Sequence, residues 1–126
     1  MTGTERSTSL DVASIQQRLR EFAEVRDWGQ FHSPKNLAMA LAAEGGELVE
    51  IFQWLTEAQS SELSEEERTR VSEELADIQI YLLRLADALD VSLPDAVEAK
   101  ILRNADKYPV ELSKGNATKY SRRERK

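Results

Sequence analysis

Two acidic pairs are the residues of this chain best suited to chemistry. The first is Glu44-Gly-Gly-Glu47 and the second is Glu74-Leu-Ala-Asp77. Residues three apart lie on one side of an α-helix, so two such helices packed together could bring four carboxylates into one place. Carboxylates that close repel and raise one another's pKa, and a hard divalent cation such as Mg²⁺ relieves that repulsion. The spacing indicates a metal site, with a charged rim around a helix bundle as the alternative.

Helical periodicity runs through the whole chain, and no segment alternates polar and apolar residues as a strand would. A first helix is predicted over 10–27 and a second over 34–56, with a loop at 28–32 between them. A third is predicted over 65–89. A shorter fourth helix ends before Pro109, because a proline disfavours helix in the residue ahead of it. The predicted fold class is all-α, a bundle of four helices.

The start of each predicted helix has a side chain that can accept hydrogen bonds from the free N–H groups of the first turn. Three of the starts have capping-box spacing, and one has a proline at its first helical position. These signals are Thr8 with Asp11, Ser33 before Pro34, Ser64 with Glu67, and Ser92 with Asp95.

The position of each acid relative to the apolar stripe of its helix separates the four from ordinary surface acids. Glu44 falls within the stripe of the second helix and Glu47 lies at its edge. Glu74 and Asp77 border the stripe of the third helix. A lone carboxylate among leucines costs several kcal/mol, so Glu44 requires a metal, a cation or a proton as its partner.

Gly45 and Gly46 lie between the first two acids. A glycine inside a helix costs up to about 1 kcal/mol relative to alanine, and two in succession need a compensating reason. We expect the close approach of another helix, or of an anionic ligand with its metal, and a kink is the alternative.

Composition restricts the class of protein. The 126 residues, 40% hydrophobic and 32% charged, fit one globular domain. The chain has no cysteine, which excludes disulfides and thiolate chemistry. The longest apolar run, 37–43, is far short of the roughly 20 residues that span a bilayer, and no signal peptide is recognised. A cytoplasmic location is expected, without membrane association.

The net charge of −6 is unevenly distributed. Residues 41–80 contain 11 acidic and 2 basic side chains, whereas 100–126 contain 9 basic and 3 acidic. Such a chain is a poor candidate for binding nucleic acid along an extended basic face. We divide it into a disordered segment, 1–9, a folded domain, 10–112, and a basic tail, 113–126.

Four segments carry motifs that together resemble those of a known family. They are Trp28-Gly-Gln-Phe-His32, Glu44-Gly-Gly-Glu-Leu-Val-Glu-Ile-Phe-Gln-Trp54, Glu73-Glu-Leu-Ala-Asp-Ile-Gln-Ile-Tyr-Leu82 and Lys100 to Pro109. In these segments, and from 15 to 120 as a whole, the chain is similar to the MazG-like all-α nucleoside triphosphate pyrophosphohydrolases. Within that family it looks most like the dCTP pyrophosphatase branch. The resemblance implies a MazG-like four-helix bundle assembled as a homotetramer, a dimer of dimers.

The resemblance also implies Mg²⁺-dependent hydrolysis of a nucleoside triphosphate to a monophosphate and pyrophosphate. The implied metal ligands are Glu44, Glu47, Glu74 and Asp77, with Glu47 also the candidate catalytic residue that orients or deprotonates water. The implied substrate-binding residues are Trp28, His32, Trp54 and Tyr81 for the nucleoside, Lys100, Asn104 and Lys107 for the triphosphate, and Tyr108 at the end of that helix.

One position departs from the family pattern and leaves the preferred base open. Leu19 stands where the vertebrate dCTP-specific members place a histidine, so a broader pyrophosphohydrolase of modified nucleotides is the alternative. A ferritin-like di-metal bundle needs Glu-x-x-His pairs, and the single histidine here lies in a predicted loop. A non-enzymatic helical adaptor would leave the glycine pair and the aromatic residues near the acids unexplained.

Overall fold

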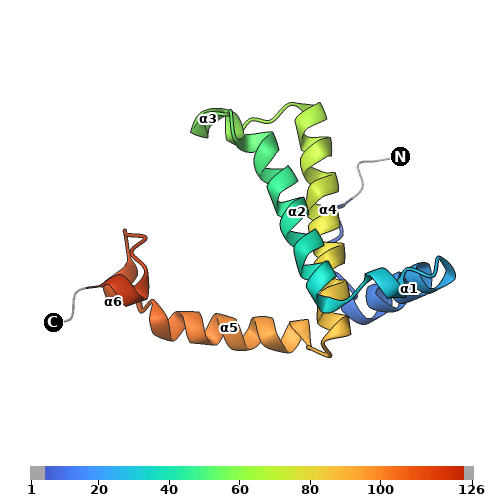
Figure 1. The fold of residues 1–126 in the computed structure, drawn as a ribbon. Helices are drawn as coiled ribbons and strands as arrows, with labels where there is room; N and C mark the ends of the chain where they lie inside the picture. Colours follow the sequence, from blue (N-terminus) through green and yellow to red (C-terminus); the bar gives the residue numbers. More distant parts are fainter. Residues whose placement is uncertain (1–4, 124–126) are drawn as a thin grey trace. The chain divides into compact units, whose positions relative to one another are not determined.

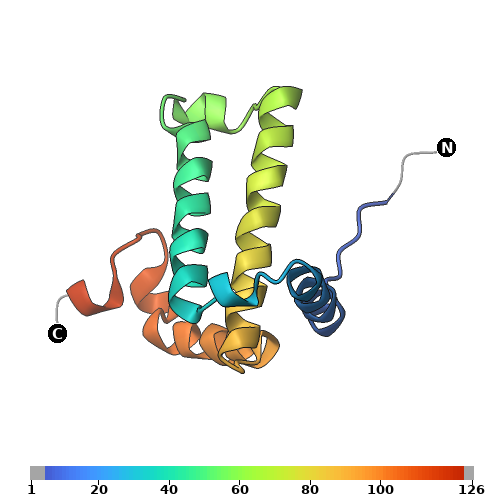
Figure 2. The same cartoon turned by 45° about the vertical axis from the view of Figure 1, so that its right-hand side comes forward.

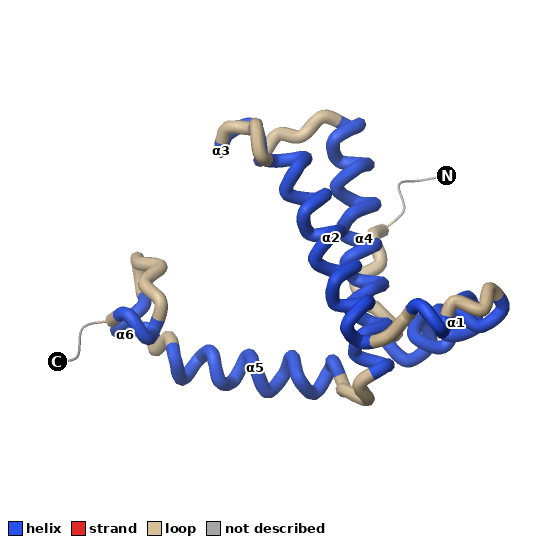
Figure 3. The backbone as a smooth tube through the Cα atoms, viewed as in Figure 1, coloured by secondary structure: helices blue, strands red, loops and turns tan. Residues whose placement is uncertain are grey.

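The computed structural model describes residues 5–123, and within them it contains helices and loops but no strand (Figure 3). The prediction of an all-α fold is confirmed. The long helices are α1 (Val12–Val25), α2 (Pro34–Phe52), α4 (Glu65–Ala88) and α5 (Leu93–Lys107). The short elements are the 3₁₀ turn η1 (Gly29–Phe31), α3 (Glu57–Ser60), α6 (Val110–Ser113) and η2 (Tyr120–Arg122).

None of the helices in the described part of the chain is long and apolar enough to cross a membrane. The helices form two compact units, a first unit up to Val91 and a second unit from Ser92 onward.

In the first unit, α2 and α4 run antiparallel and side by side (Figures 1 and 2). Leu37 on α2 and Leu83 on α4 are each 1% exposed and form the centre of the core. Burying a leucine side chain contributes about 1.5–3 kcal/mol, so this pair is a major source of stability. The core is completed by Ala23, Ile51 and Ala86.

Helix α1 packs against the C-terminal part of α4. The Gln16 Nε2 donates a hydrogen bond to the Leu83 carbonyl oxygen at 3.0 Å. Arg20 Nη1 lies 2.8 Å from one carboxylate oxygen of Asp87 and 2.7 Å from the other. These polar contacts fix how α1 lies on α4, and α1 supplies one wall of the site described below.

Most of the predicted helix starts are confirmed. Ser33 accepts a hydrogen bond from the Asn36 N–H, and Ser92 accepts one from the Asp95 N–H. Ser64 and Glu67 form a complete capping box, in which each side chain accepts a hydrogen bond from the other residue's backbone.

The predicted start of the first helix is wrong. Asp11 is itself the N-cap and accepts from the Ser14 N–H at 3.0 Å, so α1 begins at Val12 and Thr8 caps nothing. The second helix also ends earlier than predicted. Thr56 forms a capping box with Gln59 that begins α3, and the chain must leave the helical conformation ahead of such a cap.

Both α1 and α4 end in a left-handed aspartate, Asp27 and Asp90, each with φ 54°. After each aspartate the chain bonds back to its helix, from the Trp28 N–H to the Ala23 carbonyl and from the Val91 N–H to the Ala86 carbonyl, both at 2.9 Å. This is the Schellman arrangement, which satisfies the last carbonyls of a helix. At the end of α1 it also sets the direction in which Trp28 leaves the helix.

The second unit contains α5, α6 and η2, and none of its described residues is buried. Tyr120 packs edge-on against Tyr108 with ring centroids 6.0 Å apart, and Lys107 Nζ lies 4.7 Å from the Tyr120 ring. Arg123 donates a hydrogen bond to the Lys107 carbonyl oxygen. Residues 120–123 of the predicted basic tail therefore contact the end of α5. The termini 1–4 and 124–126, where parts of both predicted flanking segments fall, lie outside the described residues.

Candidate functional site

The antiparallel packing of α2 on α4 brings both acidic pairs to the same level of the first unit. Glu44 on α2 and Glu74 and Asp77 on α4 each offer a carboxylate oxygen, and these oxygens lie within 4.8 Å of one another. Glu44 and Glu74 are half-buried, whereas Asp77 is exposed. The cluster is open to a ligand on the Asp77 side.

Two oxygens of this cluster have no hydrogen-bond partner in the described part of the chain. Glu44 Oε2 and Glu74 Oε2 are both buried and unsatisfied. Contact with Glu74 is the main cause that raises the pKa of Glu44 to about 7, and burial and the neighbouring Glu47 and Asp77 carboxylates add to it. Unsatisfied, mutually repelling carboxylate oxygens suit a hard divalent cation, which prefers oxygen ligands.

Glu47 lies one turn further along α2 and is exposed. It is not among the three acids that converge most closely, but its carboxyl contacts that of Glu44 and contributes to the raised pKa of Glu44. The structure thus places the predicted catalytic residue beside the cluster.

The glycines between these acids face open space. A Cβ atom built on Gly45 or on Gly46 would meet no atom within 4 Å. The close helix approach expected from this pair is therefore not found among the described residues of this chain. Beside Glu44, the α2 backbone at these two glycines has no side chain of its own and no neighbouring atom of the described residues that would block a ligand.

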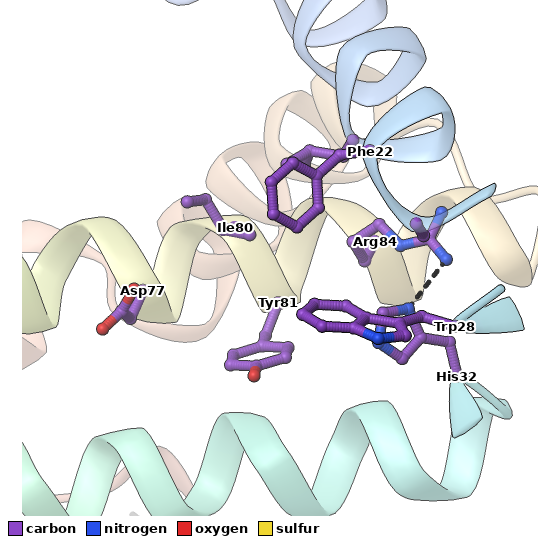
Figure 4. A pocket seen from close by; sticks show the side chains of 9 residues that line it. Phe22, Trp28, His32, Asp77, Ile80, Tyr81 and Arg84 are labelled. Atoms are coloured by element: carbon purple, nitrogen blue, oxygen red, sulfur yellow. Dashed lines mark hydrogen bonds between the residues drawn. The ribbon is translucent and has the colours of Figure 1, made fainter. Parts of the chain in front are cut away.

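A cavity of about 240 Å³ begins at Asp77 and extends between α1, α4 and the loop after α1 (Figure 4). Trp28 stands edge-on to Phe22 at 5.6 Å and to His32 at 6.2 Å between ring centroids. The cavity is lined by Leu19, Phe22, Ala23, Trp28, His32, Asp77, Ile80, Tyr81 and Arg84. Three predicted nucleoside-binding residues, Trp28, His32 and Tyr81, thus meet in one cavity that shares Asp77 with the acidic cluster.

Sequence reasoning missed Arg84. Its Nη2 lies 3.0 Å from His32 Nδ1, and burial followed by the Arg84 charge lowers the pKa of His32. The signal was present in the spacing, since Asp77, Tyr81 and Arg84 are four and then three residues apart and share one face of α4.

The remaining predicted substrate residues are not brought to this cavity by the first unit. Trp54 follows the end of α2 and is 86% exposed. Lys100, Asn104, Lys107 and Tyr108 belong to the second unit. Within that unit the charge of Lys107 is the largest cause that lowers the pKa of Lys100, so the two cations lie close together along α5.

Residues 40–122 match the model of the MazG-like family, and the chain belongs to this family. The match confirms the resemblance read from the sequence, and the α2 and α4 carboxylates lie within the matched region.

Among individual proteins, dCTP pyrophosphatase 1 of Rattus norvegicus is 48% identical over 112 residues, which are 87% of this chain and 66% of that protein. The Homo sapiens dCTP pyrophosphatase 1 is 46% identical with the same coverage. The chain thus spans just under two thirds of the length of these relatives. A crystal structure of a pyrophosphatase from Archaeoglobus fulgidus matches with a TM-score of 0.74 and 37% identity, over 84% of this chain and 99% of that one.

Proposed function

We propose that this chain hydrolyses a deoxynucleoside triphosphate, dCTP or a related pyrimidine nucleotide, between the α and β phosphates to a nucleoside monophosphate and pyrophosphate. The observation that carries the proposal is that one face of α4 joins a carboxylate cluster to an aromatic cavity through Asp77. A metal that holds phosphates beside a slot for a flat ring is what such a substrate requires. The dCTP pyrophosphatase 1 relatives support the choice of base.

In this proposal Glu44, Glu74 and Asp77 hold Mg²⁺ and Glu47 completes its ligand set. Mg²⁺ would neutralise phosphate charge and polarise phosphoryl oxygens. Glu47, exposed at the edge of the cluster, orients the attacking water and accepts its proton. Glu44 is half-buried, and its unsatisfied Oε2 is an oxygen that would bind the cation.

The cavity holds the base. Trp28 and Tyr81 offer aromatic faces, and stacking contributes about 1–3 kcal/mol per base. Lys100, Asn104 and Lys107 bind the triphosphate, for which the two neighbouring cations of α5 are suited, and Tyr108 packs at the end of that helix.

We also propose a cytoplasmic homotetramer built from dimers. On the chain alone Val49 and Trp54, at the end of α2, are exposed, and so are Ile101 and Leu102 on α5. A second copy that covers these faces would bury them and bring Trp54 to a nucleoside pocket. The residues 10–112 form the catalytic domain in this assembly, between flanking segments 1–9 and 113–126.

Leu19 favours a second candidate, a pyrophosphohydrolase of wider base range. Its apolar side chain lines the cavity where the vertebrate members place a histidine. An apolar wall makes no hydrogen bond to the base and accepts modified pyrimidines, such as those carrying a methyl group.

The test is a panel of nucleoside triphosphates with Mg²⁺, with products separated as monophosphate plus pyrophosphate or diphosphate plus phosphate. We expect pyrophosphate release from pyrimidine deoxynucleotides, loss of activity with EDTA, and loss in Glu47→Gln. Glu50→Gln is the matched control, because Glu50 is exposed on the same helix outside the cluster. Release of diphosphate, or full activity in EDTA, would contradict the proposal.

A further inference from the structure

The contact between Arg84 and His32 determines which nitrogen of the histidine carries its proton. A guanidinium can only donate hydrogen bonds, so Arg84 Nη2 donates and His32 Nδ1 must accept, at 3.0 Å. A neutral imidazole that accepts at Nδ1 carries its hydrogen on Nε2. The lowered pKa of His32 agrees with a ring that stays neutral.

Arg84 is held in this place at a cost. It is half-buried, and within residues 5–123 it forms no salt bridge. Its Nε is buried without a hydrogen-bond partner. A partly buried cation with an unsatisfied donor lowers the stability of the fold unless the charge serves a function. We therefore expect Arg84 to have a role besides packing.

The cavity orders these groups along α4. Figure 4 shows Asp77 at one end, Tyr81 in the middle, and Arg84 with His32 at the other end. A ligand whose phosphates lie at the Asp77 end presents its ring to the Arg84 end. Since His32 Nδ1 is taken by Arg84, the ring nitrogen of His32 that is left without a partner among the described residues is Nε2, which is a donor in this tautomer.

We propose that Arg84 is a positioning residue that holds His32 with its proton on Nε2, so that His32 donates a hydrogen bond to a carbonyl oxygen of a pyrimidine base. The inference rests on the proposed function and adds a basis for its selectivity. Every natural pyrimidine carries a ring carbonyl, whereas adenine has none. Arg84 therefore contributes to discrimination between dCTP and dATP.

The first experiment measures the proton position directly. His32 is the only histidine of the chain, so ¹⁵N NMR of histidine-labelled protein reports on this ring alone. We expect a protonated Nε2 and an unprotonated Nδ1. Arg84→Met should give a mixture of both tautomers, whereas Arg84→Lys, which still donates, should retain the wild-type form.

Arg70→Met is the matched control, because Arg70 is exposed on the same helix outside the cavity. Its ¹⁵N spectrum should equal that of the wild type. A wild-type ring protonated on Nδ1, or an unchanged tautomer in Arg84→Met, overturns the inference. If Arg84→Met fails to fold, the wild-type and Arg84→Lys spectra still decide it.

The second experiment measures selectivity. Losing one oriented hydrogen bond should raise KM for dCTP about tenfold in Arg84→Met with kcat little changed, while dATP is affected less. His32→Gln, whose amide N–H₂ reaches the place of Nε2–H, should retain more of the preference than His32→Leu. If Arg84→Met raises KM equally for dCTP and dATP, the inference about Arg84 is wrong but the proposed function stands. If the wild type hydrolyses no nucleoside triphosphate, both the proposed function and the inference are wrong.

Discussion

The two units of this chain are stabilised in different ways. The first unit has a buried core in which Leu37 and Leu83 are 1% exposed, and it carries the acidic cluster and the cavity. The second unit has no buried residue among its described ones, and Leu102 on α5 is 70% exposed. The first unit holds its chemical groups around a buried core, whereas apolar side chains of α5 in the second unit, such as Leu102, are exposed. We therefore expect substitutions at the acidic cluster of the first unit to lower kcat, substitutions in its core to lower stability, and substitutions of the α5 cations in the second unit to raise KM.

The largest effect is expected at the acidic cluster. Glu44→Gln removes a charge that would hold Mg²⁺, and such metal stabilisation is worth several kcal/mol, so kcat should fall by roughly 10³-fold. Steady-state kinetics with saturating Mg²⁺ measures this. Glu50→Gln should remain within twofold of the wild type. If Glu44→Gln raises KM and leaves kcat unchanged, the expected difference between the two units is contradicted.

The next effect concerns the core of the first unit. Leu83→Ala leaves a cavity between α2 and α4 and should lower the free energy of unfolding by about 2–5 kcal/mol. Urea denaturation followed by circular dichroism measures the loss. Val97→Ala on α5, where the side chain is exposed, is the comparison in the second unit and should cost less at concentrations where the chain is monomeric. Equal losses would show that the second unit has a core of its own.

The acidic cluster should also make metal-free stability depend on pH. Contact with Glu74, burial and neighbouring carboxylates raise the pKa of Glu44 from its ordinary 4.5 to about 7 in the folded chain. Between these values the folded chain holds a proton that the unfolded chain has released, so the free energy of unfolding falls as pH rises and levels off above about 7.

Thermal melts in EDTA between pH 5 and 8 measure this dependence, and adding Mg²⁺ at pH 8 should raise Tm. Glu44→Gln should flatten the profile, because its side chain does not titrate. A wild-type Tm that rises steadily from pH 5 to 8 would contradict the assignment.

A smaller effect is expected in the second unit. Lys100→Met removes one of the two neighbouring cations proposed to bind phosphate, and losing a charge-assisted hydrogen bond should raise KM roughly tenfold while kcat changes little. Lys114→Met, exposed and outside the proposed set, is the control. A fall in kcat with no change in KM would mean that Lys100 acts in the chemical step and not in substrate binding.

The smallest effect is expected at the end of the first unit. Asp90 is exposed and adopts φ 54°, a conformation that glycine reaches without steric cost. Asp90→Gly should therefore stabilise the chain by about 0.5–1 kcal/mol. Urea denaturation measures the gain, and Asp95→Gly, which places glycine inside α5, should destabilise. A destabilised Asp90→Gly variant would mean that the aspartate side chain contributes more than its backbone strain costs.

Local sequence signals predicted most of the helical framework. Ser33, Ser64 and Ser92 cap their helices as expected, since an N-cap depends on hydrogen bonds over three residues. The same reasoning failed at Asp11, which caps α1 in place of the expected Thr8, and at Thr56, whose capping box with Gln59 was not predicted and ends the second helix early. Short elements such as α3 carry too few residues for periodicity to reveal them.

The amino-acid sequence by itself determined which long helices form, that each of two helices carries an acidic pair on one side, and that the chain resembles the MazG-like family. Those properties depend on residues a few positions apart. Only the tertiary structure decided that Glu44 converges more closely with Glu74 and Asp77 than Glu47 does, and that Arg84 meets His32 across 52 positions of the chain. Such contacts depend on how α1, the loop after it and α2 pack against α4, and that packing is a property of whole helix faces.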